Sequence, residues 1–236
     1  AQWALDGLEG TLGDDGSFTV SNEPQLQAGV IRATVGGLTG ESRARVVHPF
    51  PYEEGFEAYM DGELPPGWIN AQAGRFTVST LDGNRVFEKP PDNTIFGRAR
   101  MFFGPTDWSD YTFQADVRAP TRRRQMADVG ITAQTYSLVL YGTTQKLKLE
   151  PWEPEIERSV TIPFSWEPDM WYRMKLRVEN LPDGQVRVQG KAWQVGDVEP
   201  AEWLIDRVDP IGNREGAPGL FLDAEFGAYL DNFLLT

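Results

Sequence analysis

The stretch WYRMKLRVENLPDGQVRVQGKAW, residues 171–193, decides the fold of this chain. Two runs in which apolar and polar residues alternate flank a Pro-Asp-Gly turn signal, and this pattern predicts a β-hairpin. Because successive side chains of a strand point to opposite faces, one face of the hairpin is apolar and the other is basic. The apolar face comprises Tyr172, Met174, Leu176, Val178, Val186, Val188 and Ala192, and the basic face comprises Arg173, Lys175, Arg177, Arg187 and Lys191.

The register of this hairpin bears on function. A turn centred on Pro182 would place Arg173 opposite Lys191 and Arg177 opposite Arg187. Like charges directly opposite each other destabilise a sheet, so acidic side chains or an anionic ligand should lie beside them.

Two further predicted strands, residues 110–118 and 127–134, carry Asp116 and Asp128 on their polar faces. We expect these two carboxylates to be the partners of the basic hairpin face. If they neutralise it, the face is a solvated sheet surface with weak ion pairs. If they do not, its positive charge marks a binding site for a polar or anionic ligand.

Composition limits the classes of function. The chain has 236 residues, 40% of them hydrophobic and 12% aromatic, which suffices for a sizeable core. A net charge of −13 argues against nonspecific nucleic-acid binding and against docking on anionic membranes. No apolar run approaches the roughly 18 residues that membrane insertion requires. The absence of cysteine excludes disulfides and thiolate chemistry, and the single histidine, His48, excludes a multi-histidine metal site.

The chain divides into three segments by pattern. Residues 1–48 hold short β runs separated by glycine and asparagine signals, and residues 49–55 mix proline with acidic residues, which is typical of a linker. Residues 56–236 hold roughly a dozen predicted strands, which indicates an all-β, two-sheet antiparallel jelly-roll sandwich.

The first segment resembles the C-terminal half of a bacterial Ig-like domain. The resemblance rests on Trp3, on the turn in residues 10–19, on the hairpin in residues 28–40 and on a final strand in residues 44–47. It covers about half of a seven-stranded sandwich, so we expect the chain to be part of a longer polypeptide.

The large segment resembles the concanavalin A-like lectin/glucanase superfamily, in particular its laminin-G-like members. The motifs are PPGW (65–68), DWSDYTFQADVR (107–118), MWYRMKLRVEN (170–180), GKAWQVGDVEPAEWLI (190–205), GAPGLFLD (216–223) and LDNFLL (230–235). That superfamily contains lectins, glycanases and structural modules, so the resemblance implies the fold more than an activity. The paired-carboxylate strand motif of its glucanases, E-x-D-x-x-E, is absent, and Asp223 with Glu225 is the remaining candidate pair.

Sugar recognition needs aromatic planes and planar polar groups. Trp152, between Pro151 and Glu153 in an acidic loop, is the best candidate for an exposed aromatic platform, followed by Trp108 and Trp166.

In jelly rolls of this kind the first and last strands run side by side. Carboxylates near the two ends of the segment could then share a structural calcium ion through hard oxygen ligands. Glu57, Asp61 and Asp231 are the candidate ligands.

These observations favour a non-catalytic carbohydrate-binding or surface-interaction module of a larger exported bacterial protein, extracellular or periplasmic. Its partners would be a polysaccharide or other glycan, together with other domains of the parent chain or partner subunits. The alternatives are a glycoside hydrolase of the same superfamily and an architectural subunit of an envelope assembly.

Overall fold

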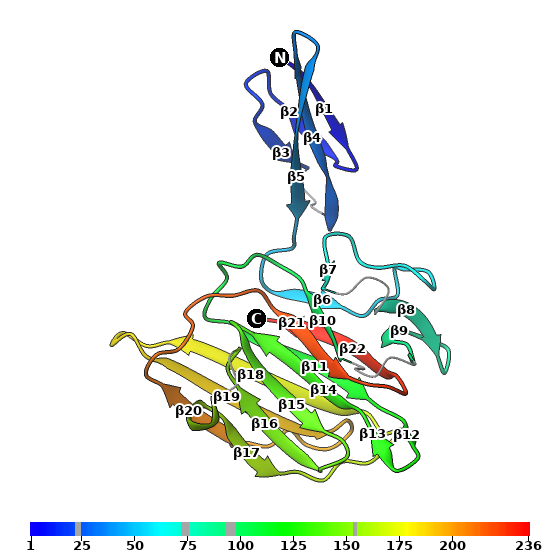
Figure 1. Ribbon diagram of the computed structural model, residues 1–236, viewed down its shortest axis with the longest axis vertical. Helices are drawn as coiled ribbons and strands as arrows, with labels where there is room; N and C mark the ends of the chain where they lie inside the picture. Colours follow the sequence, from blue (N-terminus) through cyan, green and yellow to red (C-terminus); the bar gives the residue numbers. More distant parts are fainter. Residues whose placement is uncertain (22–24, 72–75, 93–97, 153–154) are drawn as a thin grey trace. The chain divides into compact units, whose positions relative to one another are not determined.

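The computed structural model describes residues 1–21, 25–71, 76–92, 98–152 and 155–236. It is all-β with antiparallel pairing, as predicted, and it divides into two compact units (Figure 1). The first comprises Ala1–Pro49 and Pro65–Trp68, and the second comprises Phe50–Leu64 and Ile69–Thr236. The described residues contain no helix that is long and apolar enough to cross a membrane.

The first unit is built on a three-stranded sheet in the order β1 (Gln2–Asp6), β4 (Gln27–Val35) and β5 (Leu38–Val46). Gly36 and Gly37 connect β4 to β5 with φ angles of 56° and 82°, the left-handed conformation that a two-residue hairpin turn requires. A small hairpin of β2 (Gly10–Leu12) and β3 (Phe18–Val20) completes the unit. Its assignment as an Ig-like fragment stays a prediction.

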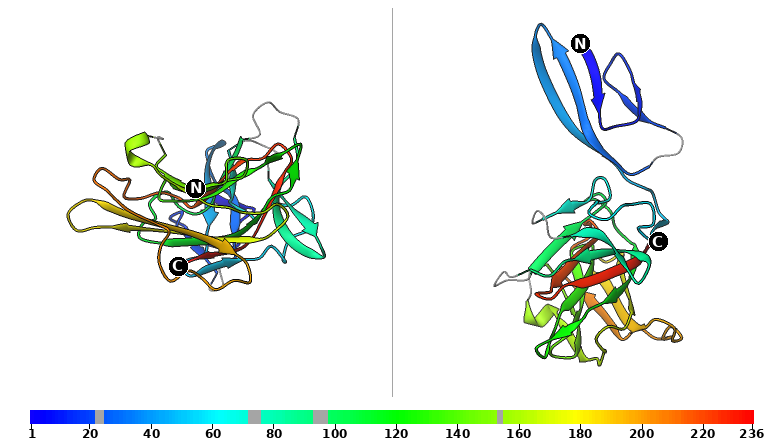
Figure 2. Two further views of the ribbon diagram at one scale, coloured as in Figure 1. Left: turned by 90° about the horizontal axis from the view of Figure 1, so that it is seen from below. Right: turned by 90° about the vertical axis from the view of Figure 1, so that its right-hand side faces the viewer.

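The second unit contains two large sheets (Figures 1 and 2). The seven-stranded sheet has the order β17 (Val160–Pro163), β16 (Lys146–Glu150), β15 (Tyr136–Tyr141), β14 (Asp128–Ala133), β21 (Gly219–Asp223), β10 (Arg98–Phe102) and β7 (Ile69–Asn70). The eight-stranded sheet has the order β20 (Ile205–Asp209), β19 (Val186–Gln194), β18 (Tyr172–Asn180), β11 (Thr112–Arg118), β22 (Ala228–Leu235), β9 (Asn84–Lys89) and β8 (Thr77–Leu81), and β6 (Tyr52–Glu54) also pairs with β22. A hairpin of β12 (Thr121–Arg122) and β13 (Gln125–Met126) and a 3₁₀ turn at Ile156–Arg158 complete the elements.

Strand β6 changes the expected boundary between the segments. Residues 52–54 lie within the stretch predicted to be a linker, yet Glu54 pairs with Phe233 and Tyr52 pairs with Leu235. These three residues are therefore part of the sheet rather than a linker.

The predicted hairpin is present as β18 and β19, and its apolar face is buried in the core. The predicted register is wrong by two residues, because the turn is centred on Asp183 and not on Pro182. Leu181 donates its N–H to the Gln185 carbonyl at 2.8 Å, and Gly184 takes φ = 88°, the left-handed position of a three-residue hairpin loop. Lys175 therefore lies opposite Lys191, and Arg173 lies opposite Trp193.

The core lies between the two sheets, where inward side chains such as Leu138, Leu176 and Leu220 are fully buried. Gly190 on β19 marks a close approach between the sheets. A Cβ atom at this position would lie 2.6 Å from Cδ1 of Leu138 on β15, a strand of the other sheet.

Gly190→Ala should therefore destabilise the protein by about 1–3 kcal/mol through overpacking. In a Leu138→Ala background the penalty should shrink, because the side chain that clashes is gone. Urea unfolding of the four proteins in this cycle measures the coupling. Gly55→Ala, where a Cβ would meet nothing within 4 Å, is the control. Equal penalties in both backgrounds would contradict the packing of these two sheets.

Candidate functional site

The basic face of the β18–β19 hairpin is neutralised by carboxylates. Arg173 donates from Nε and Nη2 to the two oxygens of Asp116 at 2.6 and 2.7 Å, so Asp116 is confirmed as an acidic partner. Glu199 lies 2.9 Å from Lys175 Nζ and 2.7 Å from Lys191 Nζ, and its carboxylate thereby bridges the two opposed ammonium groups. These hydrogen bonds, first from Lys191, lower the pKa of Glu199.

The two remaining cations of this face also have partners. Arg187 donates to Asp206 at 2.9 Å, and Arg177 lies 3.5 Å from Glu179 on its own strand. The paired charges favour the structural interpretation of this face, and the role of its five cations in ligand binding stays a prediction.

Asp128 is not a partner of the hairpin, so that expectation is wrong. Asp128 begins β14, which pairs with β15 and β21 in the other sheet. Alternation along a strand predicts which residues share a face, but it does not say which sheet the strand joins.

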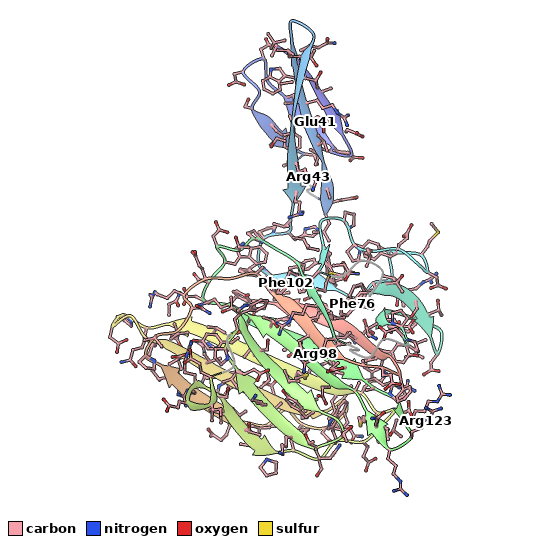
Figure 3. The ribbon with its side chains drawn as sticks, in the orientation of Figure 1. Glu41, Arg43, Phe76, Arg98, Phe102 and Arg123 are labelled. Atoms are coloured by element: carbon pink, nitrogen blue, oxygen red, sulfur yellow. The ribbon has the colours of Figure 1, made fainter. Side chains whose placement is uncertain are left out.

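The outer face of the seven-stranded sheet carries two neighbouring depressions, of about 250 and 200 Å³, which both include Tyr141. We call them together the groove. Arg98 lines one depression and Asp223 the other, and their ion pair at 3.1 Å lies where the two meet. Figure 3 labels Arg98 and Phe102 on β10, the strand that borders the groove. The groove is lined by Arg98, Arg100, Gln125, Met126, Ala127, Asp128, Ser137, Tyr141, Thr143, Thr144, Lys148, Glu150, Pro151, Trp152, Phe221, Asp223, Glu225 and Phe226.

The outward-facing residues in the middle of the seven-stranded sheet are buried. Thr132, Ser137 and Val139 occupy outward positions of β14 and β15, because they alternate with the core residues of those strands, yet each is at most 5% exposed. Neighbouring side chains on this face therefore cover these three short residues.

Trp152 and Arg100 form the most distinctive part of the groove. Trp152 is 48% exposed, as the sequence predicts, and the Arg100 guanidinium carbon lies 4.5 Å from its ring centre and 4.9 Å from that of Phe221. Burial lowers the pKa of Arg100. Within the described part of the chain, the Arg100 guanidinium has no ion pair and no hydrogen bond, so its donors are free for a ligand.

Asp128 and Asp223 are directly opposed on β14 and β21, with both side chains on the groove side. Burial, followed by the nearby charge of Asp223, raises the pKa of Asp128 to about 6, although the Gly142 N–H donates to it at 3.0 Å. Burial likewise raises the pKa of Tyr141 to about 12. Asp128 can therefore be protonated at about pH 6 and below while Asp223 is ion-paired with Arg98.

The other two tryptophan candidates lie outside the groove. Trp166 is 2% exposed, packs edge-on against Tyr172 and donates from Nε1 to the Tyr141 carbonyl at 3.3 Å, so it is a core residue and the prediction of an exposed platform is wrong. Trp108 is half-buried against Phe50, with ring centres 4.4 Å apart.

The three residues predicted to bind calcium have other partners in the structure, and a calcium site stays a prediction. Asp61 pairs with Arg85, Glu57 accepts the Arg85 N–H at 3.2 Å, and Asp231 accepts from Asn84 at 2.8 Å. Among the residues that the structure describes, no group of three or more acidic or histidine side chains is placed to share a metal ion.

Replacing Asp128 tests the cost of burying its charge. The raised pKa means that Asp128 favours the folded state at pH below about 4, and that this contribution is lost as the pH rises through about 6. Asp128→Asn keeps the oxygen that accepts from Gly142 and cannot ionise. We expect its Tm to exceed that of the wild type by about 2–4 °C at pH 8 and to match it below about pH 4. Calorimetry across this range checks it, with Asp183→Asn in the exposed turn as control. A loss of stability at pH 8 would contradict the account.

Comparisons with known proteins agree with the fold. No family model and no curated protein sequence matches the chain. Among solved structures, the carbohydrate-binding module CBM66 from Bacillus subtilis is similar at 14% identity, with a TM-score of 0.50 over 72% of this chain and 94% of that one. The alginate lyase Aly36B (12% identity, TM-score 0.48, 80% of this chain and 97% of that one) and lectin II from Ulex europaeus (9%, 0.48, 78% and 97%) also match. The second unit is thus a two-sheet antiparallel jelly-roll sandwich that is similar in fold to this module.

Proposed function

We propose that this protein is a non-catalytic module that binds a carbohydrate chain in the groove of the seven-stranded sheet. The observation that carries the proposal is the exposed Trp152 ring stacked on Arg100, whose donors have no partner within the described residues. An indole provides a flat surface for the C–H face of a sugar ring, and a guanidinium provides planar donors for its oxygens. The two depressions together offer room for more than one sugar unit.

The charges of the depression that holds Trp152 favour an acidic glycan, because Arg98, Arg100 and Lys148 line it together with one carboxylate, Glu150. Arg98 pairs with Asp223 and Lys148 pairs with Glu150, which leaves Arg100 as the cation without a carboxylate partner in the described part of the groove. A carboxylate or sulfate on a sugar would complete this pairing through two parallel hydrogen bonds. Because the chain as a whole carries a charge of −13, such binding depends on local contacts and not on long-range attraction.

The fold and the motif order support the proposal, because the similar Bacillus subtilis structure is described as a carbohydrate-binding module. We infer that the protein acts outside the cytoplasm, as one part of a larger exported bacterial protein. An architectural role in an envelope assembly is the outcome that remains if no glycan binds.

A glycoside hydrolase is the second candidate, and the Asp128–Asp223 pair favours it. Directly opposed residues on neighbouring strands have Cβ atoms about 5 Å apart, which is near the carboxyl spacing of retaining glycosidases. A protonated acid beside an ionised carboxylate is the arrangement that such chemistry uses, and the raised pKa of Asp128 fits the acid.

Trp152→Ala and Arg100→Gln should each weaken binding of an acidic polysaccharide at least tenfold, because each removes one of the two contacts that orient the sugar. Isothermal titration against paired acidic and neutral polysaccharides measures this. Arg100→Gln should affect the acidic member of each pair more. Trp203→Ala, which changes a tryptophan that packs on Lys191 outside the groove, is the matched control. Binding that survives both groove variants, or that is absent across the panel, would contradict the proposal.

Incubation with the polysaccharide that binds best separates a binding module from a hydrolase. We expect no new reducing ends from the wild type over a day at pH 5–7. Cleavage that Asp128→Asn and Asp223→Asn each reduce at least a hundredfold, while binding persists, would replace the binding module with a glycosidase.

A further inference from the structure

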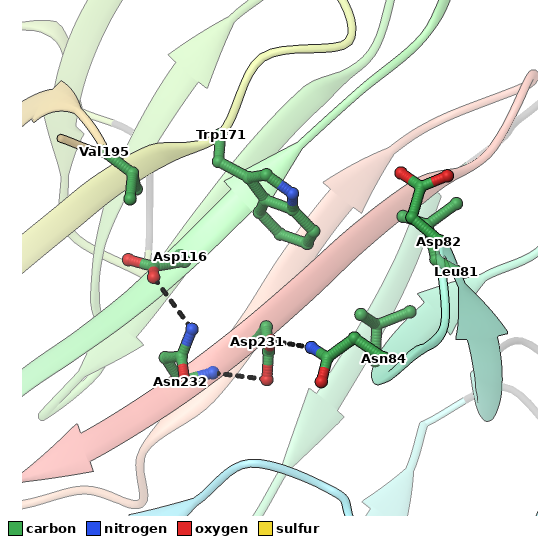
Figure 4. Close-up of a pocket in the computed structure, with 9 residues that line it drawn as sticks. Leu81, Asp82, Asn84, Asp116, Trp171, Val195, Asp231 and Asn232 are labelled. Atoms are coloured by element: carbon green, nitrogen blue, oxygen red, sulfur yellow. Dashed lines mark hydrogen bonds between the residues drawn. The ribbon is translucent and has the colours of Figure 1, made fainter.

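A separate pocket of about 230 Å³ lies on the outer face of the eight-stranded sheet (Figure 4). It shares no residue with the groove. We propose that this pocket binds one neutral sugar ring, through an aromatic wall and the carboxylate of Asp231, which accepts from sugar hydroxyls. Its lining comprises Leu81, Asp82, Asn84, Val86, Asp116, Trp171, Val195, Asp231 and Asn232.

A β-bulge builds the polar side of the pocket. The pairing of β11 with β22 shifts register between Gln114 and Asp116, and Asn232 takes φ = 52°, a left-handed conformation that is uncommon for a residue other than glycine. The bulge lets the consecutive residues Asp231 and Asn232 both line the pocket, although alternation would place them on opposite faces. Bulges of this kind re-aim side chains and concentrate near functional sites.

Internal hydrogen bonds hold these groups in place. The Asn84 side chain donates to Asp231 at 2.8 Å, the Asn232 N–H donates to Asp231 at 2.7 Å, and the Asn232 side chain donates to Asp116 at 3.0 Å (Figure 4). A carboxylate can accept about four hydrogen bonds, so Asp231 keeps capacity for a ligand after these two. The pocket therefore presents fixed acceptors before any ligand arrives, which lowers the entropic cost of binding.

Trp171 supplies the apolar side. Its indole points toward Asp231 in Figure 4. Leu81, Val86 and Val195 are the other apolar residues that line the pocket. An aromatic ring beside a few convergent polar groups matches the two sides of a pyranose, which has an apolar C–H face and a rim of hydroxyls. The volume is below the roughly 300–1,000 Å³ of sites for drug-sized ligands, so the pocket suits a single ring.

The charges and hydrogen bonds of the pocket disfavour anionic sugars and metal ions as ligands. Asp116 is paired with Arg173 and Asp82 with Arg118, so Asp231 is the carboxylate of the pocket that has no cation partner among the described residues and that disfavours an anionic sugar. A metal ion is disfavoured because the carboxylates already accept hydrogen bonds. Arg173 donates to both oxygens of Asp116. The Asn84 side chain donates to Asp231, and the Asn232 side chain donates to Asp116. The described residues also hold no group of three acidic side chains placed to share a metal ion. A neutral polyol is the chemistry that both donates to these oxygens and packs on the indole.

Titration of the full chain with glucose, galactose, mannose and fructose, followed by tryptophan fluorescence and by NMR, tests the proposal. At least one sugar should bind with millimolar affinity. Asn84→Ala and Asp231→Asn should each weaken that binding at least tenfold. Trp152→Ala in the groove should leave it within twofold, so failure here is distinct from failure of polysaccharide binding in the groove.

Thermal unfolding of both pocket variants establishes that they fold, and Asn84→Ala serves alone if Asp231→Asn does not. No saturable shift with any of the four sugars at 50 mM would overturn the proposal. Sugar binding that is lost in Trp152→Ala but kept in Asn84→Ala would also overturn it, as would calcium binding that Asn84→Ala and Asp231→Asn abolish.

Discussion

The two sheets of the second unit pack against each other through their apolar inner faces, and the rest of the structure depends on this contact. Core residues such as Phe113, Leu138 and Leu176 are fully buried, and Gly190 lets β19 approach Leu138 across the core. Burying such side chains provides the main favourable free energy of folding. Because side chains alternate along each strand, fixing the inner face also fixes which residues lie outside.

The two outer faces use their charges differently. On the eight-stranded sheet the cations of the hairpin pair with carboxylates, which leaves that face largely neutral. Exposed ion pairs each contribute about 0–1 kcal/mol, so this network positions side chains more than it stabilises the fold. One of those pairs, Arg173 with Asp116, also anchors Asn232 beside the second pocket. On the seven-stranded sheet, by contrast, Arg100 lies between two aromatic rings without a carboxylate partner in the described residues.

The sequence predicted what depends on local pattern. Alternation predicted the hairpin, its apolar and basic faces and the all-β class, and the acidic proline-rich setting of Trp152 predicted its exposure. The register failed because Gly184 and not Pro182 determines the turn. Asp128 was placed beside the wrong strands, and Trp166 was expected at the surface, because sheet membership and burial depend on contacts between distant parts of the chain.

Arg100 is a second example of a feature that the sequence pattern of one strand does not predict. It alternates with apolar neighbours in β10, as the hairpin cations do, and that pattern alone could have marked a second outward face. Its significance comes from Phe221 and Trp152, which β21 and the loop after β16 bring to it from more than 50 residues away in the chain. No periodicity within one strand encodes such a cluster.

Chemical-shift mapping of isotopically labelled protein with an acidic oligosaccharide tests the central claim most directly. The account predicts saturable changes at Arg100, Trp152, Tyr141 and their neighbours on β10, β15 and β21. Changes confined to the eight-stranded sheet or to the first unit, with these residues unaffected, would contradict it.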